Sequence, residues 1–295
     1  MLLTTKIPIG YIFKNTKKDM FFVFCVAVLT VLIYRYYDIA NIPPNITGLV
    51  GTSISLVIAF KLSQSYERWW EARKIWGAIV NDSRTLVLQL RSFTKSQESE
   101  VVNRMAERQI AWCYSLGQSL RNLSPVEGVD DFLLPDELEK VKKHKNVPLG
   151  LLDYHSLDLS TLHGSKSIND YQQMQLDKTI VRLCESMGKA ERIKNTVFPT
   201  TYRLFLHWFI YIFVILLSIT LAETDGYGDI PLLMLITAPF FLLEKTAYFL
   251  QDPFENRPTD ISVTLIANSI HTNIRQLMDS TDLPVAIEKG DFYVM

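Results

Sequence analysis

Long runs of apolar residues dominate both ends of this chain. Two windows, Met20 to Tyr37 and Phe205 to Ala222, approach the roughly 20 mostly apolar residues that a helix needs to cross a bilayer. A third, Ile230 to Phe249, carries a glutamate and a lysine near one end, and a fourth, Gly48 to Leu62, is shorter and more polar. The pattern predicts four membrane-spanning helices, two near each end of the chain.

The fourth window continues into a much longer helical pattern. It begins near Gly48, where Asn45 or Thr47 can cap it after a pair of prolines, and it does not stop until about Phe93. No proline interrupts this stretch, so we expect one continuous helix that crosses the bilayer and projects well beyond it.

The middle of the chain predicts further helices joined by loops. One amphipathic helix runs from Gln97 to Leu123, and another from Ile168 to Asn195. Between them, prolines and glycines break residues 127–167, so we expect loops around one short helix, Pro135 to Lys145. After the last span, "DPFENRPTD" indicates an extended surface turn, and Ile261 to Met278 one more helix. The predicted fold class is all-α.

The distribution of charge predicts the orientation. The net charge of −1 gives no reason to expect a nucleic acid partner. Lysines 14, 17 and 18 precede the first span and cations follow the second, so the positive-inside rule places both termini and the middle region in the cytoplasm. The predicted segments are 1–19 (cytoplasmic), 20–95 (first two membrane helices, the second extending into the cytoplasm), 96–200 (cytoplasmic helices), 201–250 (third and fourth membrane helices) and 251–295 (cytoplasmic turn, helix and tail).

A crowded aromatic and charged segment follows the second window. Its centre is Arg68, Trp69, Trp70 and Glu71. Tryptophan favours the headgroup zone of a bilayer, and arginine beside it can pair with a carboxylate or a lipid phosphate. We interpret this segment as the point where the long helix leaves the membrane.

Within the second window, Thr52, Leu56 and Phe60 recur every four residues and share one helix face. Small residues on the other faces allow neighbouring helices to approach closely in lipid. Two interpretations follow: the helix packs inside its own bundle, or this face forms the apolar wall of a channel.

Enzyme and cofactor motifs are weak or missing. "STLHGSKS" lacks the first glycine of a phosphate-binding loop, and the five histidines never fall at metal-ligand spacing. We therefore predict no enzyme, no cofactor and no metal site. His207 lies within a membrane span, which leaves a functional or an interfacial role open.

Three stretches resemble one family of membrane proteins. "AFKLSQSYERWWEARKIWGAIVNDSR", "ERIKNTVFPTTYRLFLHW" and "LQDPFENRPTDISVTLIANSI" are similar, in this order, to segments of the bacterial bestrophin-like ion channels. The resemblance implies a homopentamer in the bacterial inner membrane, with a hydrophobic neck at Thr52, Leu56 and Phe60. Thr52 is more polar than the residue usual at its position.

The resemblance also implies a second constriction, near Tyr171 or the competing Ile168. Asp170 beside it would favour cations. Eukaryotic bestrophins bind calcium with an acidic run that here is reduced to Asp252, Glu255 and Asp260, so we predict no comparable site. The expected function is passage of small monovalent ions, chloride-type anions favoured. The alternatives are a cation-selective channel, or a scaffold or sensor without ion flux.

Overall fold

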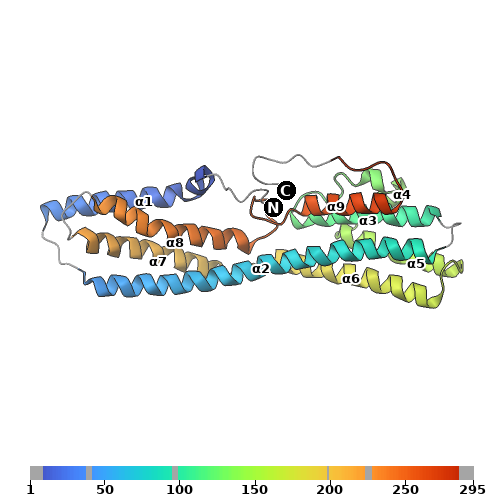
Figure 1. The fold of residues 1–295 in the computed structure, drawn as a ribbon, viewed down its shortest axis with the longest axis horizontal. Helices are drawn as coiled ribbons and strands as arrows, with labels where there is room; N and C mark the ends of the chain where they lie inside the picture. Colours follow the sequence, from blue (N-terminus) through green and yellow to red (C-terminus); the bar gives the residue numbers. More distant parts are fainter. Residues whose placement is uncertain (1–8, 38–41, 95–98, 198, 223–227, 286–295) are drawn as a thin grey trace. The chain divides into compact units, whose positions relative to one another are not determined.

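The computed structural model describes residues 9–37, 42–94, 99–197, 199–222 and 228–285, and within these ranges every regular element is a helix. The predicted all-α class is confirmed. Four helices are long and apolar enough to cross a membrane, as predicted (Figure 1): α1 (Ile9–Tyr36), α2 (Pro44–Phe93), α7 (Thr200–Leu221) and α8 (Asp229–Gln251). The chain is therefore a multi-pass membrane protein.

The described residues form two compact units. Residues 9–69 and 197–252 form one, which we call the membrane unit, and residues 70–196 and 253–285 form the other, which we call the extramembrane unit. Helix α2 contributes to both, because its 50 residues run without interruption past the boundary at Trp69 and Trp70. That continuity confirms the prediction of one very long helix.

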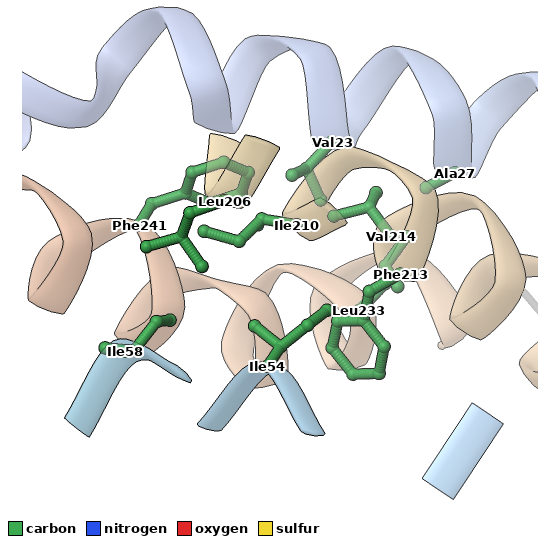
Figure 2. Packing of buried hydrophobic residues seen from close by; sticks show 10 residues of the cluster. All are labelled: Val23, Ala27, Ile54, Ile58, Leu206, Ile210, Phe213, Val214, Leu233 and Phe241. Atoms are coloured by element: carbon green, nitrogen blue, oxygen red, sulfur yellow. The ribbon is translucent and has the colours of Figure 1, made fainter. Parts of the chain in front are cut away.

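The membrane unit is held together by an apolar core. Helix α1 packs along α8 and α7, and α7 packs along α8. Side chains from all four helices meet in this core (Figure 2): Val23, Ala27, Ile54, Ile58, Leu206, Ile210, Phe213, Val214, Leu233 and Phe241. They lie four residues apart in α1 and α2, one to four apart in α7 and eight apart in α8, so each helix presents one buried stripe.

Helix α2 starts earlier than predicted. It begins at Pro44, where the lack of a backbone N–H costs nothing because the first turn has no acceptor for it. Thr47 therefore lies inside the helix, and its hydroxyl is 2.8 Å from the Thr220 hydroxyl of α7. The prediction that Asn45 or Thr47 caps this helix is wrong.

Besides the end of α2, the described residues of the extramembrane unit form five α-helices and one short 3₁₀ helix, η2 (Asp130–Phe132). The α-helices are α3 (Ser99–Leu120), α4 (Pro135–Val141), α5 (Val147–Gly164), α6 (Asp170–Asn195) and α9 (Val263–Leu277). Helix α3 packs against α5 and α9, and α5 packs against α6. The predicted helices at α3, α6 and α9 are confirmed within a few residues.

The expectation of loops around one short helix in residues 127–167 is wrong, because α5 occupies 18 of these residues. Asn146 caps it by accepting a hydrogen bond from the Leu149 N–H at 3.1 Å. Pro148 falls in the first turn, where proline is tolerated. Gly150 faces the His144 ring, and a Cβ there would lie 3.1 Å from Cγ of that ring. Both supposed breakers therefore belong to the start of a helix.

The turn after α8 is more buried than predicted. Phe254 and Asp260 are each only 1% exposed. The Asp260 carboxylate accepts hydrogen bonds from the backbone N–H groups of Glu255 and Arg257, at 2.7 and 3.0 Å. The segment is a turn, but an anchored one and not a surface loop.

Candidate functional site

Helix α2 buries only a narrow seam in the membrane unit. Ile54 and Ile58 are 2% exposed, and Lys61 and Ser65, which continue the seam at helical spacing, are fully buried. Ile54 and Ile58 join the core that includes Phe213 of α7 (Figure 2). The rest of this part of α2 makes little contact with its own chain.

The predicted neck residues lie on the face opposite this seam. Positions on a helix advance by about 100° per residue, which puts Thr52, Leu56 and Phe60 between about 160° and 240° around the axis from Ile54. All three are exposed, Leu56 and Phe60 at 58% each. The structure therefore brings them together on one open face, and they do not pack inside their own bundle.

The polar groups on this part of α2 are turned back to the backbone. The hydroxyl of Thr52 donates to the Gly48 carbonyl at 2.9 Å, and those of Ser53 and Ser55 donate to the carbonyls four residues earlier. A hydroxyl bonded in this way offers less to water. Thr52 therefore presents a less polar surface than its free hydroxyl group would, and in this respect it is closer to Leu56 and Phe60.

The segment interpreted as the membrane boundary is fixed by contacts within each unit. In the membrane unit, Arg68 lies 3.9 Å from Asp252, and the Trp69 ring stacks at 6.1 Å from Tyr66. In the extramembrane unit, Glu71 forms an ion pair of 2.9 Å with Arg192, while Trp70 is 47% exposed. These side chains anchor α2 on both sides of the predicted boundary.

The candidates for the second constriction differ in exposure. Tyr171, in the first turn of α6, is 82% exposed, whereas Ile168 is 3% exposed and packs inside the unit. Asp170 is exposed and lies 2.7 Å from the His163 ring. Asn169 and Gln172 cap the helix reciprocally, which fixes where this turn begins.

The carboxylates of the reduced acidic run each have a protein partner. Asp252 faces Arg68, and Glu255 pairs with Lys194 at 2.7 Å, which lowers the pKa of Glu255. Burial raises the pKa of Asp260 to about 6, although its two backbone hydrogen bonds oppose that shift. Within the described ranges, no group of three His, Cys, Asp or Glu side chains is placed to hold a metal ion.

A polar cluster around His207 was not predicted as a site. The His207 ring lies 3.2 Å from Glu244 through Nδ1 and 3.8 Å from Asp19 through Nε2. Asp19 also accepts a hydrogen bond from the Tyr211 hydroxyl at 3.0 Å. Helices α1, α7 and α8 are therefore joined by charged groups at one end of the membrane unit. The only signal in the sequence was the presence of ionisable residues inside apolar windows.

Comparisons with known proteins agree with this architecture. Residues 2–276 match the family described as "Bacterial/Fungal Bestrophin protein". Among curated relatives, the voltage-dependent anion channel-forming protein YneE of Escherichia coli (strain K12) is 26% identical over 268 residues, 90% of this chain and 87% of that protein. The voltage-dependent anion channel-forming protein alr2987 of Nostoc is 27% identical over 278 residues, 91% of this chain and 87% of that protein.

A solved structure has the same fold. The crystal structure of a bacterial bestrophin homolog from Klebsiella pneumoniae superposes with a TM-score of 0.85 and 23% identity, over 89% of this chain and 98% of that one. Because the family match covers nearly the whole chain, the chain belongs to the bacterial and fungal bestrophin family.

Proposed function

We propose that this chain is the subunit of a homopentameric channel that passes small monovalent anions of the chloride type. The observation that carries the proposal is the face of Thr52, Leu56 and Phe60. It lies in a candidate membrane span, and the helices of its own chain leave it exposed. Family membership supports it, as do two relatives named as anion channel-forming proteins.

The residues of α2 favour contact with other copies of itself over contact with lipid. Helix α1 exposes large apolar side chains such as Phe21 and Leu29, which suit acyl chains. Helix α2 also exposes large apolar side chains such as Leu49, but beside its neck face it exposes the small residues Ser53, Ser55 and Ala59. Small residues of this kind let helices approach closely within a bilayer. Five copies of α2 around one axis would bury these faces against each other and leave the neck residues on the axis.

A neck of this composition would act as a hydrophobic constriction. Rings of leucine and phenylalanine offer no ligand to an ion and gate by excluding water. The threonine ring contributes little polarity, because each hydroxyl is bonded to its own backbone. This face is best suited to the passage of weakly hydrated anions through uncharged rings of neck side chains.

The second constriction is proposed at Tyr171. Its side chain is largely exposed, whereas Ile168 is buried and would need to move to face a pathway. Asp170 supplies the observation behind the main alternative, a cation-selective channel of the same architecture. Its carboxylate lies beside His163, so a protonated His163 would offset the negative charge that would otherwise attract cations.

The orientation and location rest on the sequence. The lysines near the start of α1, ahead of its apolar stretch, and the cations after the second span would place both termini and the extramembrane unit in the cytoplasm, with the four helices in the bacterial inner membrane. A passive channel needs no catalytic residue and no cofactor, in line with the absence of a recognisable catalytic motif in the sequence.

The proposal is tested in planar bilayers with purified protein. Replacing Leu56 and Phe60 by alanine should raise single-channel conductance, because both remove bulk from the neck. Val57→Ala is the matched control, since Val57 lies on α2 beside the buried seam. Reversal potentials in asymmetric sodium chloride, and then in sodium gluconate, report the permeant ion, and the mass of the solubilised assembly reports the subunit number.

The outcomes separate the alternatives. A shift of the reversal potential toward the sodium potential would favour the cation-selective channel. No current from a correctly assembled pentamer, together with a stably bound protein partner, would favour a scaffold or sensor. Equal conductance in the parent and both neck variants would contradict the assignment of the neck.

A further inference from the structure

A cavity of about 330 Å³ lies between α7 and α8 in the membrane unit. We call it the α7–α8 cavity. Its lining is Arg203, Leu204 and His207 from α7, and Glu244, Lys245 and Tyr248 from α8. These positions recur at spacings of one, three and four residues, so each helix presents one continuous patch to the cavity. Leu204 is exposed, so the cavity opens to the surface of the unit.

Two cations line the cavity without a carboxylate of their own. The Arg203 guanidinium lies 5.1 Å from the centre of the Tyr248 ring, and the Lys245 ammonium lies 6.0 Å from the same centre. Among the described residues, neither group forms an ion pair, because the one lining carboxylate, Glu244, contacts His207 instead. Two positive charges therefore lie close to one aromatic ring, with no carboxylate paired to either of them in the described residues.

A third cation lies behind the lining. Lys61 of α2 is fully buried, and its Nζ has no hydrogen-bond partner in the part of the chain that the structure describes. It interacts electrostatically with both Glu244 and Arg203. Burying an ammonium group without a partner is costly. Among the described residues, the carboxylates that contact the lining are Glu244 and Asp19, so three cations face two carboxylates.

The cavity lies near the ends of its helices. Arg203 is in the first turn of α7, and Tyr248 is in the last turn of α8. Asp19 of α1, next to Lys17 and Lys18 in the sequence, reaches His207 of the lining, so these lysines mark the same end of the unit. Basic and aromatic side chains at a helix end lie at the depth of lipid headgroups.

We propose that the α7–α8 cavity binds the phosphodiester of an anionic phospholipid from the leaflet on the Lys17 and Lys18 side. Arg203 and Lys245 bind the phosphate oxygens, and Lys61 raises the positive potential from behind. Basic pockets between membrane helices are known to hold such headgroups. The lipid tails lie along the apolar surface of α7 beyond Leu204, where Phe205 and Trp208 are exposed. The site requires the membrane topology but not ion conduction.

The test measures lipid retained by the solubilised full-length protein in native mass spectrometry. Phosphatidylglycerol is compared with phosphatidylcholine of the same chains, because only the first carries a net negative charge. The variant Arg203→Met/Lys245→Met keeps the length of both stems but removes both charges. The control Lys17→Met/Lys18→Met removes the same charge from exposed positions at the same end of the unit.

We expect the parent protein to prefer phosphatidylglycerol. The cavity variant should lose affinity about tenfold or more, and the control less than about twofold. Equal loss in both double variants, or equal binding of the two lipids, would overturn the proposal. Full displacement of phosphatidylglycerol by millimolar inorganic phosphate would also overturn it, by identifying a free-anion site.

If the double variant does not fold, the single variant Lys245→Met replaces it in the same comparison, because the Lys245 side chain is partly exposed and its loss should be tolerated. Ion currents are not needed, so a non-conducting protein would still answer the question.

Discussion

Each unit of this protein contains a cluster of charged side chains that includes a buried cation, Arg108 or Lys61, and the two clusters differ in how completely their charges are paired. In the extramembrane unit, Arg108 bonds both Glu137 and Asp158, and Arg104 bonds the second oxygen of Asp158 at 2.5 Å. Two cations thus meet two carboxylates. In the membrane unit, Lys61, Arg203 and Lys245 outnumber the nearby carboxylates and adjoin a cavity.

The difference separates a structural role from a binding role. A cluster whose charges cancel within the chain holds helices together and needs nothing from outside. Arg108 is 2% exposed and joins α3 to α4 and α5 in this way. A cluster with spare cations beside an open cavity is incomplete without an anion. The following substitutions test this contrast, in order of decreasing expected effect.

The largest effect should come from Arg108→Met. It leaves the buried Glu137 carboxylate without a cation, and breaking a buried pair on one side costs about 3–5 kcal/mol. Thermal unfolding followed by circular dichroism in detergent measures the loss. Arg182→Met is the control, because Arg182 is 46% exposed and its pair with Asp82 should contribute less than about 1 kcal/mol. Equal unfolding temperatures for the two variants would contradict a structural role for the paired cluster.

The next largest effect on stability should come from adding a methyl group to the apolar core of the membrane unit. A Cβ on Gly51 would lie 2.9 Å from the buried Phe213 ring, whereas a Cβ on Gly48 would meet nothing within 4 Å. Gly51→Ala should therefore destabilise by about 1–3 kcal/mol through overpacking. Gly48→Ala should stabilise by up to about 1 kcal/mol through helix propensity. The same unfolding measurement compares them, and a reversed order would show that α2 does not pack on α7 as described.

The pH dependence of stability should come from two groups of opposite sign in the extramembrane unit. Burial, aided by Arg275, lowers the pKa of His271 to about 4, so its contribution is present above pH 6.5 and is lost as the pH falls toward 4. The pKa of Asp260 is raised to about 6, so its contribution is present below pH 3.8 and is lost as the pH rises through 6.

Two variants separate these contributions. With Asp260→Asn, which keeps an acceptor for the backbone N–H groups, stability should rise from pH 5 to pH 7 by about 1 kcal/mol more than in the parent. With His271→Gln it should rise by about 2 kcal/mol less. Unfolding temperatures at the two pH values measure both slopes, and identical slopes in the two variants would refute this assignment.

The smallest effect should come from Lys245→Met in lipid-free detergent. This side chain is partly exposed and has no ion pair in the described structure, so its removal should change stability by less than about 0.5 kcal/mol. Arg108→Met removes one cation in the same way but breaks buried pairs, which makes the two variants a direct comparison. A loss as large as that of Arg108→Met would show that the membrane cluster is also a structural one.

Much of the fold was predictable because its signals are local. Apolar windows of sufficient length predicted all four membrane helices. The amphipathic pattern from Ile168 to Asn195 predicted α6, whose apolar stripe from Leu176 to Ile193 is buried. The sequence does not predict helix α5, because Pro148 and Gly150 have the character of helix breakers. Proline in a first turn is compatible with a helix, and only the contact with His144 explains the glycine. Tertiary contacts of this kind cannot be recovered from local pattern.

The candidate sites also differ in whether they depend on local pattern or on tertiary contacts. Thr52, Leu56 and Phe60 lie on one helix, so helical spacing and a family resemblance were enough to select them. The charged cluster joins residues far apart in sequence, such as Asp19 with Tyr211 and Lys61 with Glu244. Spacing rules do not reach across such separations. Ionisable residues inside apolar windows were the only sequence signal of this cluster, and they did not indicate which residues are in contact.

Thiol accessibility tests the central claim, that the face of α2 carrying Leu56 lines an ion pathway. Leu56→Cys and Val57→Cys place the new thiol on different faces of the same turn, and the parent, with Cys25, Cys113 and Cys184, gives the background. Under a membrane-impermeant methanethiosulfonate reagent, bilayer currents should fall strongly for Leu56→Cys and stay near the parent value for Val57→Cys. An unchanged current through Leu56→Cys after addition of the reagent, or equal block of both variants, would contradict the account.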